Sequence, residues 1–486
     1  MTDHSVSRRH LLGAAATVGA VAMAGTVTAC DTSPSSQGGA GKLTWWDHSP
    51  NLQAANHAAY AEWKKVGGLD VDYTYIQTAK IGQSLQLAKQ SNQLPDVTVN
   101  VGLNLPLPNL ISDNWFQPLQ LTDEARKKLD DAKVLFEGIH TFEGKLYSFP
   151  IQSPKQFWSA NWFNTNLMAK ADLDPANPPT TFQEFRDAGK KIMATTKGSY
   201  AWIANIGMTD RMATQVHHLA TAAGFQGMNG TLFHTGEFAV DSEPYLQVLE
   251  FLLSLNTDKM MMPGSISFDD KIARQRWATG IAGFYFDGPW CPGVVIKDAK
   301  AFMSKIGVGG QVMPQPGMRN VAYAGPQGGV YWTTGSSKIP DKAGQLLSLQ
   351  TSATYQQAIA TGMAQPPQDV SVVAQSDAHE SYKKLIGLYQ RDAFLGPTPV
   401  VRNPDVAKVD AANAPIKPTF GDIIQGAFSG DVADWRKALT DYSAKVNAQR
   451  ADGIKKVNAK GGKVSADDYA FPDWKPRQDF TAEMYK

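Results

Sequence analysis

The start of the globular chain alternates between two hydrophobic periods, and this alternation constrains the fold more than any other feature. Residues 43–46 form a strand-like run, and the apolar residues of 52–66 then recur at helical spacing. Residues 71–75 alternate as a second strand, residues 81–94 repeat the helical pattern, and residues 97–101 give a third strand. Strands that alternate with helices in this way predict a parallel sheet with right-handed crossovers. We therefore expect an α/β fold.

Polar and aromatic residues follow the first and third of these strands. Trp46, Asp47 and His48 stand at the end of the first strand, and Asn100 stands at the end of the third. In open parallel sheets ligands bind beyond the carboxyl ends of the strands, so we expect these residues to face one crevice. An indole that stacks on C–H groups, beside side chains that bond hydroxyls, is typical of a sugar site. The alternatives are that Trp45 and Trp46 pack in the core and that Asp47 caps the next helix.

The first thirty residues have the features of an export signal. Residues 7–12 (SRRHLL) resemble the twin-arginine motif, and residues 27–30 (VTAC) resemble a lipobox whose Cys30 becomes lipidated. These patterns predict a signal peptide over residues 1–29, a lipid anchor at Cys30 and a flexible tether over residues 30–41. The alternative is an ordinary exported protein cut at the same point. We expect export by the twin-arginine route to the outer face of the cytoplasmic membrane, with the lipid anchor as the membrane contact.

The charge balance argues against several classes of partner. The 486-residue chain carries a net charge of +1, and the signal holds two arginines against one aspartate, so the rest is neutral. A neutral body argues against nucleic acid and against a polybasic membrane surface, and it suits an uncharged ligand. If Cys30 is acylated, Cys291 has no partner within the chain, so we expect no disulfide. The length predicts two domains.

Sequence motifs for catalysis and for cofactors are absent. The chain has no G-x-S-x-G elbow, no phosphate-binding loop, no H-E-x-x-H and no calcium loop. His217 and His218 are neighbours and diverge on a helix, so they make a poor metal pair. We therefore expect no metal, no cofactor and no enzymatic activity.

A set of short segments in a fixed order carries a family resemblance over nearly the whole globular chain. They resemble segments of the extracellular solute-binding proteins (family 1, maltose-binding-protein-like) of ABC sugar importers. The segments are TWWDHS (44–49), LPDVTV (94–99), WFQPL (115–119), GKLYSFPI (144–151), WFNTNLMAKADL (162–173), PPTTFQEF (178–185), GIAGFYFDGPW (280–290), VMPQPG (312–317) and GGVYWTTGSSK (328–338).

The resemblance implies a type II periplasmic-binding-protein-like fold. This fold has two α/β lobes that are discontinuous in sequence, are joined by hinge crossings and close on a ligand. In chain order, residues 42–149 and 282–326 are expected in the first lobe, and residues 152–279 and 330–455 in the second. Residues 456–486 form a C-terminal extension that the resemblance does not explain. The crossings are expected near Pro150, Gly280 and Gly328.

The resemblance also suggests ligand contacts near the crossings. Trp290 matches the family position whose tryptophan stacks on sugar, Asp287 is expected to accept from hydroxyls, and Trp158 is expected to face the cleft. The alternatives are packing between the lobes for Trp290 and a turn for Asp287. Trp162 and Trp202 are expected in the core. The remaining predicted contacts are Gly328, Gly329 and Trp332.

Together these features predict a membrane-tethered, monomeric receptor that traps a sugar or oligosaccharide and hands it to the permease subunits of an ABC importer. A surface glycosidase is one alternative, for which Asp47 and Asp287 are the pair of carboxyls to nominate. The same fold could instead bind a glycerophosphodiester, a peptide or a polyamine, although the quoted segments are poor in cations for a phosphate. A scaffold lipoprotein with a degenerate cleft is the last alternative.

Overall fold

The computed structural model describes residues 41–485. All of them fall within one compact unit of the chain, residues 36–486. The predicted signal peptide, Cys30 and nearly all of the predicted tether lie outside the described residues. Within residues 41–485, no helix combines the length and the apolar character that crossing a membrane requires.

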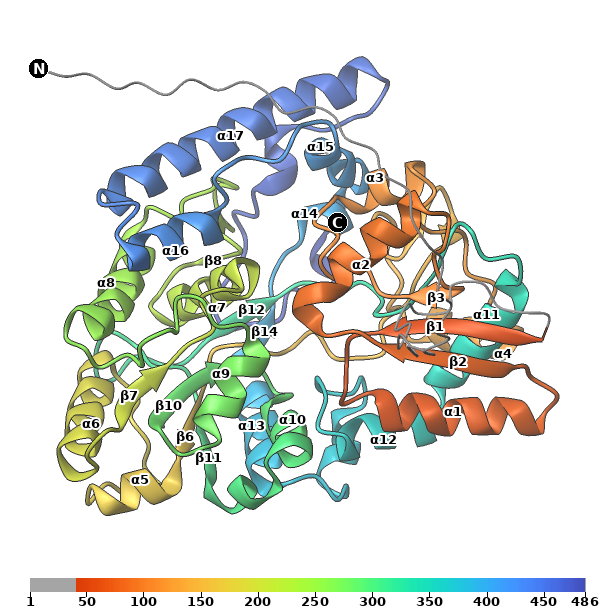
Figure 1. Ribbon diagram of the computed structural model, residues 1–486. Helices are drawn as coiled ribbons and strands as arrows, with labels where there is room; N and C mark the ends of the chain where they lie inside the picture. Colours follow the sequence, from red (N-terminus) through yellow and green to blue (C-terminus); the bar gives the residue numbers. More distant parts are fainter. Residues whose placement is uncertain (1–40, 486) are drawn as a thin grey trace, which may run out of the picture. The chain divides into compact units, whose positions relative to one another are not determined.

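The first sheet is built from the N-terminal strands that the sequence predicts. It has four strands in the order β13-β3-β1-β2, which are Trp332–Thr333, Val97–Thr98, Lys42–Asp47 and Asp70–Tyr75. Strand β1 lies parallel to β2 and to β3, as predicted, while β13 is antiparallel to β3. Helices α1 (Gln53–Lys65) and α2 (Thr78–Gln90) connect these strands (Figure 1). They bury Trp63, Ile81 and Leu85 in the core around this sheet, which is the first core.

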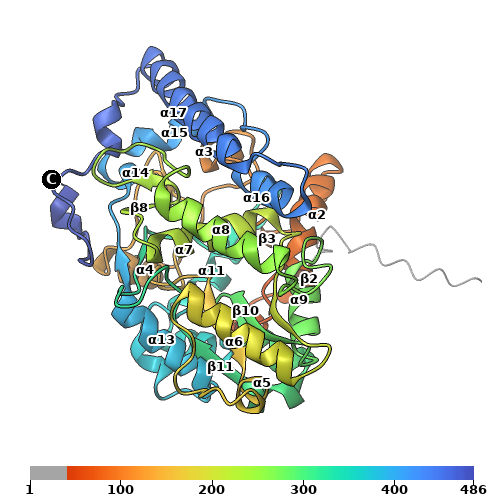
Figure 2. The ribbon, with the colours of Figure 1, turned by 90° about the vertical axis from the view of Figure 1, so that its left-hand side faces the viewer.

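The second sheet lies between two layers of helices. Its order is β11-β6-β10-β7, which are Ile306–Gly309, Ala160–Asn164, Ala282–Asp287 and Tyr200–Ile203. One face packs against α6, α7 and α8, which are Phe182–Thr195, Thr209–Ala222 and Glu243–Thr257. The other face packs against α9, α10 and α13, which are Asp270–Trp277, Cys291–Asp298 and Glu380–Asp392 (Figure 2). Every residue of β10 is buried, because this strand is central and covered on both faces.

The strand pairing corrects the expected division of the chain. Residues 282–326 were predicted in the first lobe, but β10 and β11 pair with β6 of the second sheet. Residues 330–455 were predicted in the second lobe, but β13 joins the first sheet, and α11 (Pro340–Ser348) and α12 (Ala353–Thr361) pack in the first core. A fully buried apolar strand fits either sheet equally well, so hydrophobicity alone could not assign β10.

The chain crosses between the two cores three times. The first crossing lies just after the predicted Pro150, between Ile151, which packs around the first sheet, and Phe157, which packs around the second sheet (the second core). The second lies at Gly328, just before the chain re-enters the first core. Gly280 instead follows α9 and leads straight into β10, so no crossing occurs there. The third crossing follows α12, where Pro367 forms a bridge with Gln152 of the first crossing.

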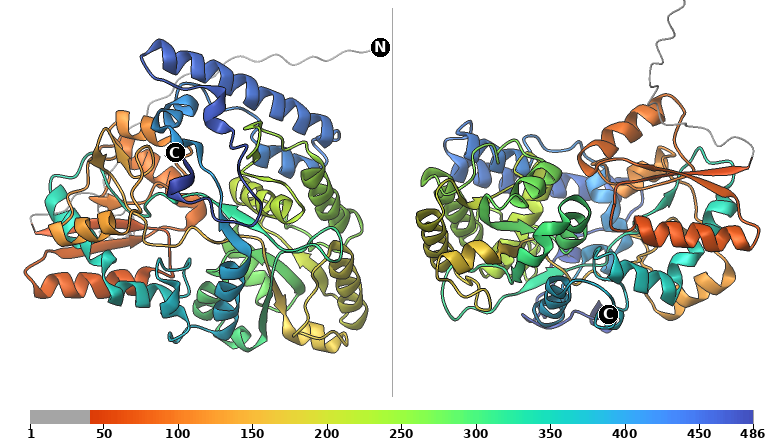
Figure 3. Two further views of the ribbon diagram at one scale, coloured as in Figure 1. Left: turned by 180° about the vertical axis from the view of Figure 1, so that it is seen from behind. Right: turned by 60° about the horizontal axis from the view of Figure 1, so that its bottom comes forward.

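The C-terminal chain is integrated into the fold. Helix α17 (Trp435–Ala459) follows α16 (Phe420–Ser429) and runs through residue 456, so the predicted boundary at that point is wrong. The chain beyond α17 packs beside β12 (Ala322–Ala324) and β14 (Ala393–Leu395), as the dark blue trace in Figure 3 shows. Its buried side chains are Val464, Tyr469, Phe471, Trp474 and Phe480. The carboxylate of Asp479 also lies 2.5 Å from Lys155 Nζ, which ties this segment to the chain just after the first crossing.

Candidate ligand-binding site

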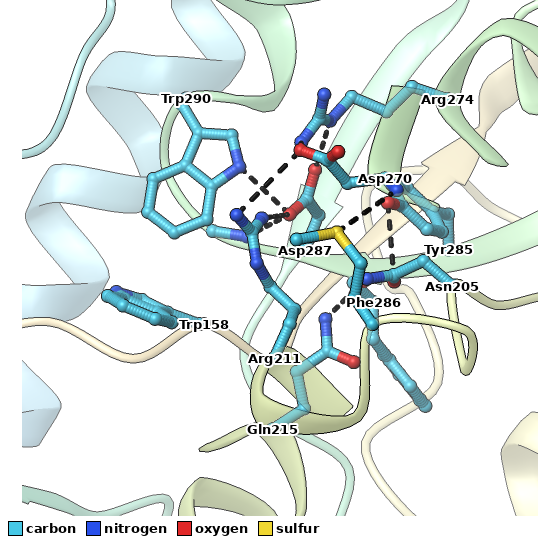
Figure 4. Close-up of polar contacts among 12 residues, drawn as sticks. Trp158, Asn205, Arg211, Gln215, Asp270, Arg274, Tyr285, Phe286, Asp287 and Trp290 are labelled. Carbon is cyan, nitrogen blue, oxygen red and sulfur yellow. Dashed lines mark hydrogen bonds and ion pairs between the residues drawn. The ribbon is translucent and has the colours of Figure 1, made fainter. Parts of the chain in front are cut away.

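Two predicted contact residues meet at the edge of the second sheet. The ring centroids of Trp158 and Trp290 lie 5.1 Å apart, with their planes at 75° (Figure 4). Trp158 precedes β6, and its backbone N–H donates to His218 Nδ1 (2.9 Å). Trp290 follows β10 through a Gly-Pro turn, and a Cβ added at Gly288 would lie 2.4 Å from its indole. Glycine therefore lets this indole fold back against the turn. Both tryptophans are half-buried.

A buried ion-pair cluster lies beside Trp290. The indole N–H of Trp290 donates to Asp287 Oδ1 (3.0 Å), and the guanidinium of Arg274 donates to Asp287 Oδ2 (2.7 Å) and to Asp270 Oδ2 (2.6 Å) (Figure 4). Burial alone would raise the pKa of Asp270, but Arg274 and Arg211 outweigh burial and hold this pKa at about 2. Asp270 is therefore charged at neutral pH.

Arg211 lies over both indoles. It belongs to the first turn of α7, and its guanidinium carbon is 4.8 Å from the ring centroid of Trp290 and 5.8 Å from that of Trp158. Helix α7 is fixed to β10 by Gln215, whose Nε2 donates to the backbone oxygen of Phe286 (2.9 Å). The helix thus places a cation against two aromatic faces, which is a favourable contact.

The end of the first sheet faces this cluster. The pKa of His48 is lowered by burial, and Arg211 and Asp270 are among the charges that act on it, so His48 lies near the cluster. Direct hydrogen bonds join the two sides: Asn51 Nδ2 donates to the backbone oxygen of Trp290 (3.0 Å), and Gln77 Nε2 donates to Asp269 Oδ2 (2.8 Å). The site therefore lies where the carboxyl end of β1 meets the end of β10.

Three predicted contacts in or beside the first sheet are buried instead. Trp46 is 4% exposed and packs in the first core, and Trp332 is fully buried with its indole N–H donating to Gly329 O (3.0 Å). Asp47 is fully buried, and it accepts hydrogen bonds from the hydroxyls of Tyr331 (3.0 Å) and Tyr73 (3.3 Å). These predicted ligand contacts are corrected: the three side chains are core residues in this structure.

The helix-cap alternative for Asp47 also fails. Helix α1 follows Leu52 and has no side-chain cap, while Asp47 Oδ1 accepts from the backbone N–H of Ser49 (3.0 Å). Burial raises the pKa of Asp47, and His48 and these hydrogen bonds only partly offset the effect. Asp47 therefore organises the first core around the strand end.

The remaining predicted residues have mixed placements. Trp162 and Trp202 are buried in the second core, as predicted. Asn100 is half-buried after β3, so its ligand contact stays a prediction. A Cβ added at Gly328 would meet open space, whereas one at Gly329 would lie 2.5 Å from Ser148 Cβ. Gly329 is therefore explained by close packing of two crossing segments.

Three charged residues of the site were not predicted from the sequence. Arg211, Asp270 and Arg274 stand on α7 and α9, in polar runs that match no motif. Their proximity to Asp287 depends on how two helices pack on β10, which periodicity does not encode. Only the spacing of Asp270 and Arg274, one helical turn apart, was a signal in the sequence.

Two cavities lie away from this cluster. One, of about 420 Å³, is lined by residues that include Pro106, Met228, Asp410 and Arg450. The other, of about 340 Å³, is lined by residues of the crossings and of the C-terminal segment. Neither lining includes a predicted ligand contact. Within residues 41–485, no cluster of three or more His, Cys, Asp and Glu side chains could hold a metal ion. Cys291 is a buried free thiol.

Known structures share the fold of this chain. One is an ABC transporter solute-binding protein from Thermotoga lettingae bound with alpha-D-tagatose (TM-score 0.61, 18% identity, 84% of this chain and 100% of that one). Another is the GacH receptor of Streptomyces glaucescens, solved unliganded and with acarbose (TM-score 0.62, 17% identity). The alignment covers 85% of this chain and 99% of that one. A third is a cyclic alpha-maltosyl-1,6-maltose binding protein from Arthrobacter globiformis (TM-score 0.55, 18% identity). The alignment covers 85% of this chain and 99% of that one. The predicted two-lobed, periplasmic-binding-protein-like α/β fold is confirmed.

Sequence comparison gives a family match as well. A family model described as bacterial extracellular solute-binding protein matches residues 46–357. No curated protein matches the chain.

Proposed function

The chain belongs to the family of bacterial extracellular solute-binding proteins, and we propose that it captures a sugar or oligosaccharide and delivers it to the permease subunits of an ABC importer. The observation that carries the proposal is the pair formed by Trp158 and Trp290, 5.1 Å apart, where the two sheets meet. Half-buried indoles offer stacking surface to the C–H faces of a sugar ring. The half-buried His48, at the end of the first sheet beside this cluster, offers a hydrogen-bonding group to its hydroxyls.

Contacts between the part of the molecule around the first sheet (the first side) and the part around the second sheet (the second side) fit this role. Asn51 and Gln77 on the first side reach the backbone of Trp290 and the side chain of Asp269 on the second. These hydrogen bonds exist only when the sides are together, so they favour the closed state. A ligand that contacts both sides adds to the same preference and shifts the population toward closure.

The export route and the anchor are part of the proposal. The twin-arginine motif and the lipobox at Cys30 support a monomeric lipoprotein on the outer face of the cytoplasmic membrane. Such an anchor keeps the receptor close to its permease. Labelling with a radioactive fatty acid tests the anchor, because Cys30→Ala is expected to abolish the label.

The buried carboxyls favour binding over hydrolysis. A glycosidase needs two carboxyls that reach the scissile bond. Asp47 and Asp287 are both fully buried, and each is engaged by internal hydrogen bonds or ion pairs. Incubation with oligosaccharides is therefore expected to leave them intact.

A thermal-shift screen tests the proposed ligand class. The panel holds mono- and oligosaccharides, with glycerophosphocholine, a tripeptide and spermidine for the alternative solutes. A sugar at one hundred times its Kd is expected to stabilise the protein by about 2.7 kcal/mol. Trp290→Ala is expected to remove the shift, while Trp435→Ala on α17, another half-buried tryptophan, is expected to keep it. A shift with a non-sugar solute alone, or an unchanged shift in Trp290→Ala, contradicts the proposal.

A further inference from the structure

We infer that Arg211 contacts the ligand and that its setting selects an uncharged sugar over an acidic one. This inference rests on the proposed function and names the substrate class of the same site. It concerns a residue that no motif in the sequence singles out.

Arg211 lies beside the two stacking surfaces. Its guanidinium carbon lies 4.8 Å from the Trp290 ring centroid and 5.8 Å from that of Trp158, and its side chain is 11% exposed. In Figure 4 the guanidinium points toward the carboxylate of Asp287, alongside the indole of Trp290. A sugar ring that packs against either indole on the side of the guanidinium therefore lies within reach of Arg211.

Arg211 has unused hydrogen-bonding capacity. A guanidinium carries five N–H donors. Among the described residues, the contacts of Arg211 are long: 3.5 Å from NH1 to Asp287 Oδ1 and 3.7 Å from NH2 to Asp270 Oδ2. Arg274 binds the same two carboxylates at 2.7 and 2.6 Å. Arg274 thus holds the carboxylates, and most donors of Arg211 are left for hydroxyl oxygens.

The formal charges of the ion-pair cluster balance. Two guanidinium groups, of Arg211 and Arg274, face two carboxylates, of Asp270 and Asp287, so the cluster is neutral. His48 adds no charge at neutral pH, because burial lowers its pKa. An acidic ligand that approached Arg211 would bring its carboxylate close to both aspartates, and like charges repel. A hydroxyl accepts from Arg211 without that cost.

Paired sugars test this inference by isothermal titration calorimetry. The pairs are D-glucose with D-glucuronate, D-galactose with D-galacturonate, and maltotriose with tri-galacturonate. The wild-type protein is expected to bind the uncharged member of at least one pair and to reject its acidic partner. Stronger binding of the acidic member overturns the inference but leaves sugar capture standing. Failure of all six probes and of the wider sugar panel contradicts the proposed function itself.

Two variants separate ligand contact from a purely structural role. Arg211→Gln is expected to weaken binding of the uncharged sugar about tenfold to a hundredfold, the range for a hydrogen bond to a charged group. Arg211→Lys is expected not to restore it, because an ammonium lacks the planar fork that lies on an indole. The control is Arg186→Gln, since Arg186 on α6 pairs with Asp258, which directly follows α8, outside the site. Unchanged affinity in Arg211→Gln overturns the inference.

Asp270→Asn tests the charge balance directly. It keeps the side-chain shape and leaves the cluster with one excess positive charge. We expect the preference for the uncharged member of a pair to fall about tenfold, because the acidic member then meets weaker repulsion. A structural role for Asp270 alone would weaken both members equally, and that result contradicts the charge-balance argument.

Discussion

Two short stretches of this chain contain the same residue types and end in different surroundings. TWWDHS (44–49) and FDGPW (286–290) each combine tryptophan with aspartate at the end of a strand. In the first stretch, Trp45 and Trp46 are buried and Asp47 is bonded within the core. In the second, Trp290 is half-buried beside Trp158, and Asp287 belongs to the ion-pair cluster.

The difference comes from where each tryptophan sits relative to its strand. Trp45 and Trp46 are inside β1, whose two faces are both covered, so either direction leads into the core. Trp290 follows a Gly-Pro turn and precedes α10, so its ring lies beyond the strand end. Composition therefore cannot distinguish a core aromatic from a cleft aromatic, whereas a turn that interrupts the strand can.

Acid is expected to have the largest effect on stability, and to act through two histidines of α7, one of which bonds the backbone of Trp158 beside Trp290. His217 and His218 are half-buried on α7, and their desolvation lowers their pKa values to about 3 and about 4. Because the unfolded chain binds these protons near pH 6.5, stability falls as the pH drops below that value, by about 3 kcal/mol for each histidine at pH 4. Asp47 in TWWDHS contributes in the opposite direction. Burial raises its pKa, so its contribution to stability increases as the pH falls.

Melting temperatures between pH 7 and pH 4 measure this effect. The wild-type value is expected to fall steeply, and His217→Gln is expected to flatten part of the fall. A melting temperature that stays constant over this range contradicts the burial of both imidazoles as neutral groups.

Trp45→Ala is expected to be the most damaging single substitution in the first region. Removing a fully buried indole costs about 3–5 kcal/mol of unfolding free energy. Trp45→Phe is the matched control, because the indole N–H of Trp45 is buried without a hydrogen-bond partner and its loss removes no bond. Urea denaturation measures both. If Trp45→Ala abolished sugar binding without loss of stability, the assignment of this tryptophan to the core would be wrong.

Removing the carboxylate charge is expected to cost more stability at Asp287 than at Asp47. Asp287→Asn weakens the pair with the buried Arg274 and is expected to cost about 3 kcal/mol. Asp47→Asn is expected to cost less than about 1 kcal/mol, because its partners include the neutral Tyr331 and Asn56. Chemical denaturation of both variants checks the difference, and equal costs would show that the two carboxylates have the same role.

A methyl group at the turn is expected to have the smallest effect. Gly288→Ala places a Cβ 2.4 Å from the Trp290 indole, so the ring must shift, at about 1 kcal/mol. Gly328→Ala places a Cβ in open space and serves as the control. Sugar affinity is expected to fall in the first variant and to stay unchanged in the second. Equal affinities would mean that the position of Trp290 does not matter for binding.

The sequence predicted the fold better than it predicted the site. The N-terminal strands were predictable because their hydrophobic period changes with each element. The sheet that β10 joins was not predictable, because all six of its residues are buried and fit either core. Trp158 and Trp290 were brought together as the resemblance suggested, and their ligand contact stays a prediction. Arg211 was not predictable, because its place depends on the packing of α7 against β10.

A crystal structure with the tightest-binding uncharged sugar is the most direct test. We expect the sugar ring against Trp158 and Trp290, with an Arg211 N–H within hydrogen-bonding distance of a hydroxyl oxygen. A sugar bound elsewhere, for example in the 420 Å³ cavity beside Asp410 and Arg450, would contradict the assignment of the binding site.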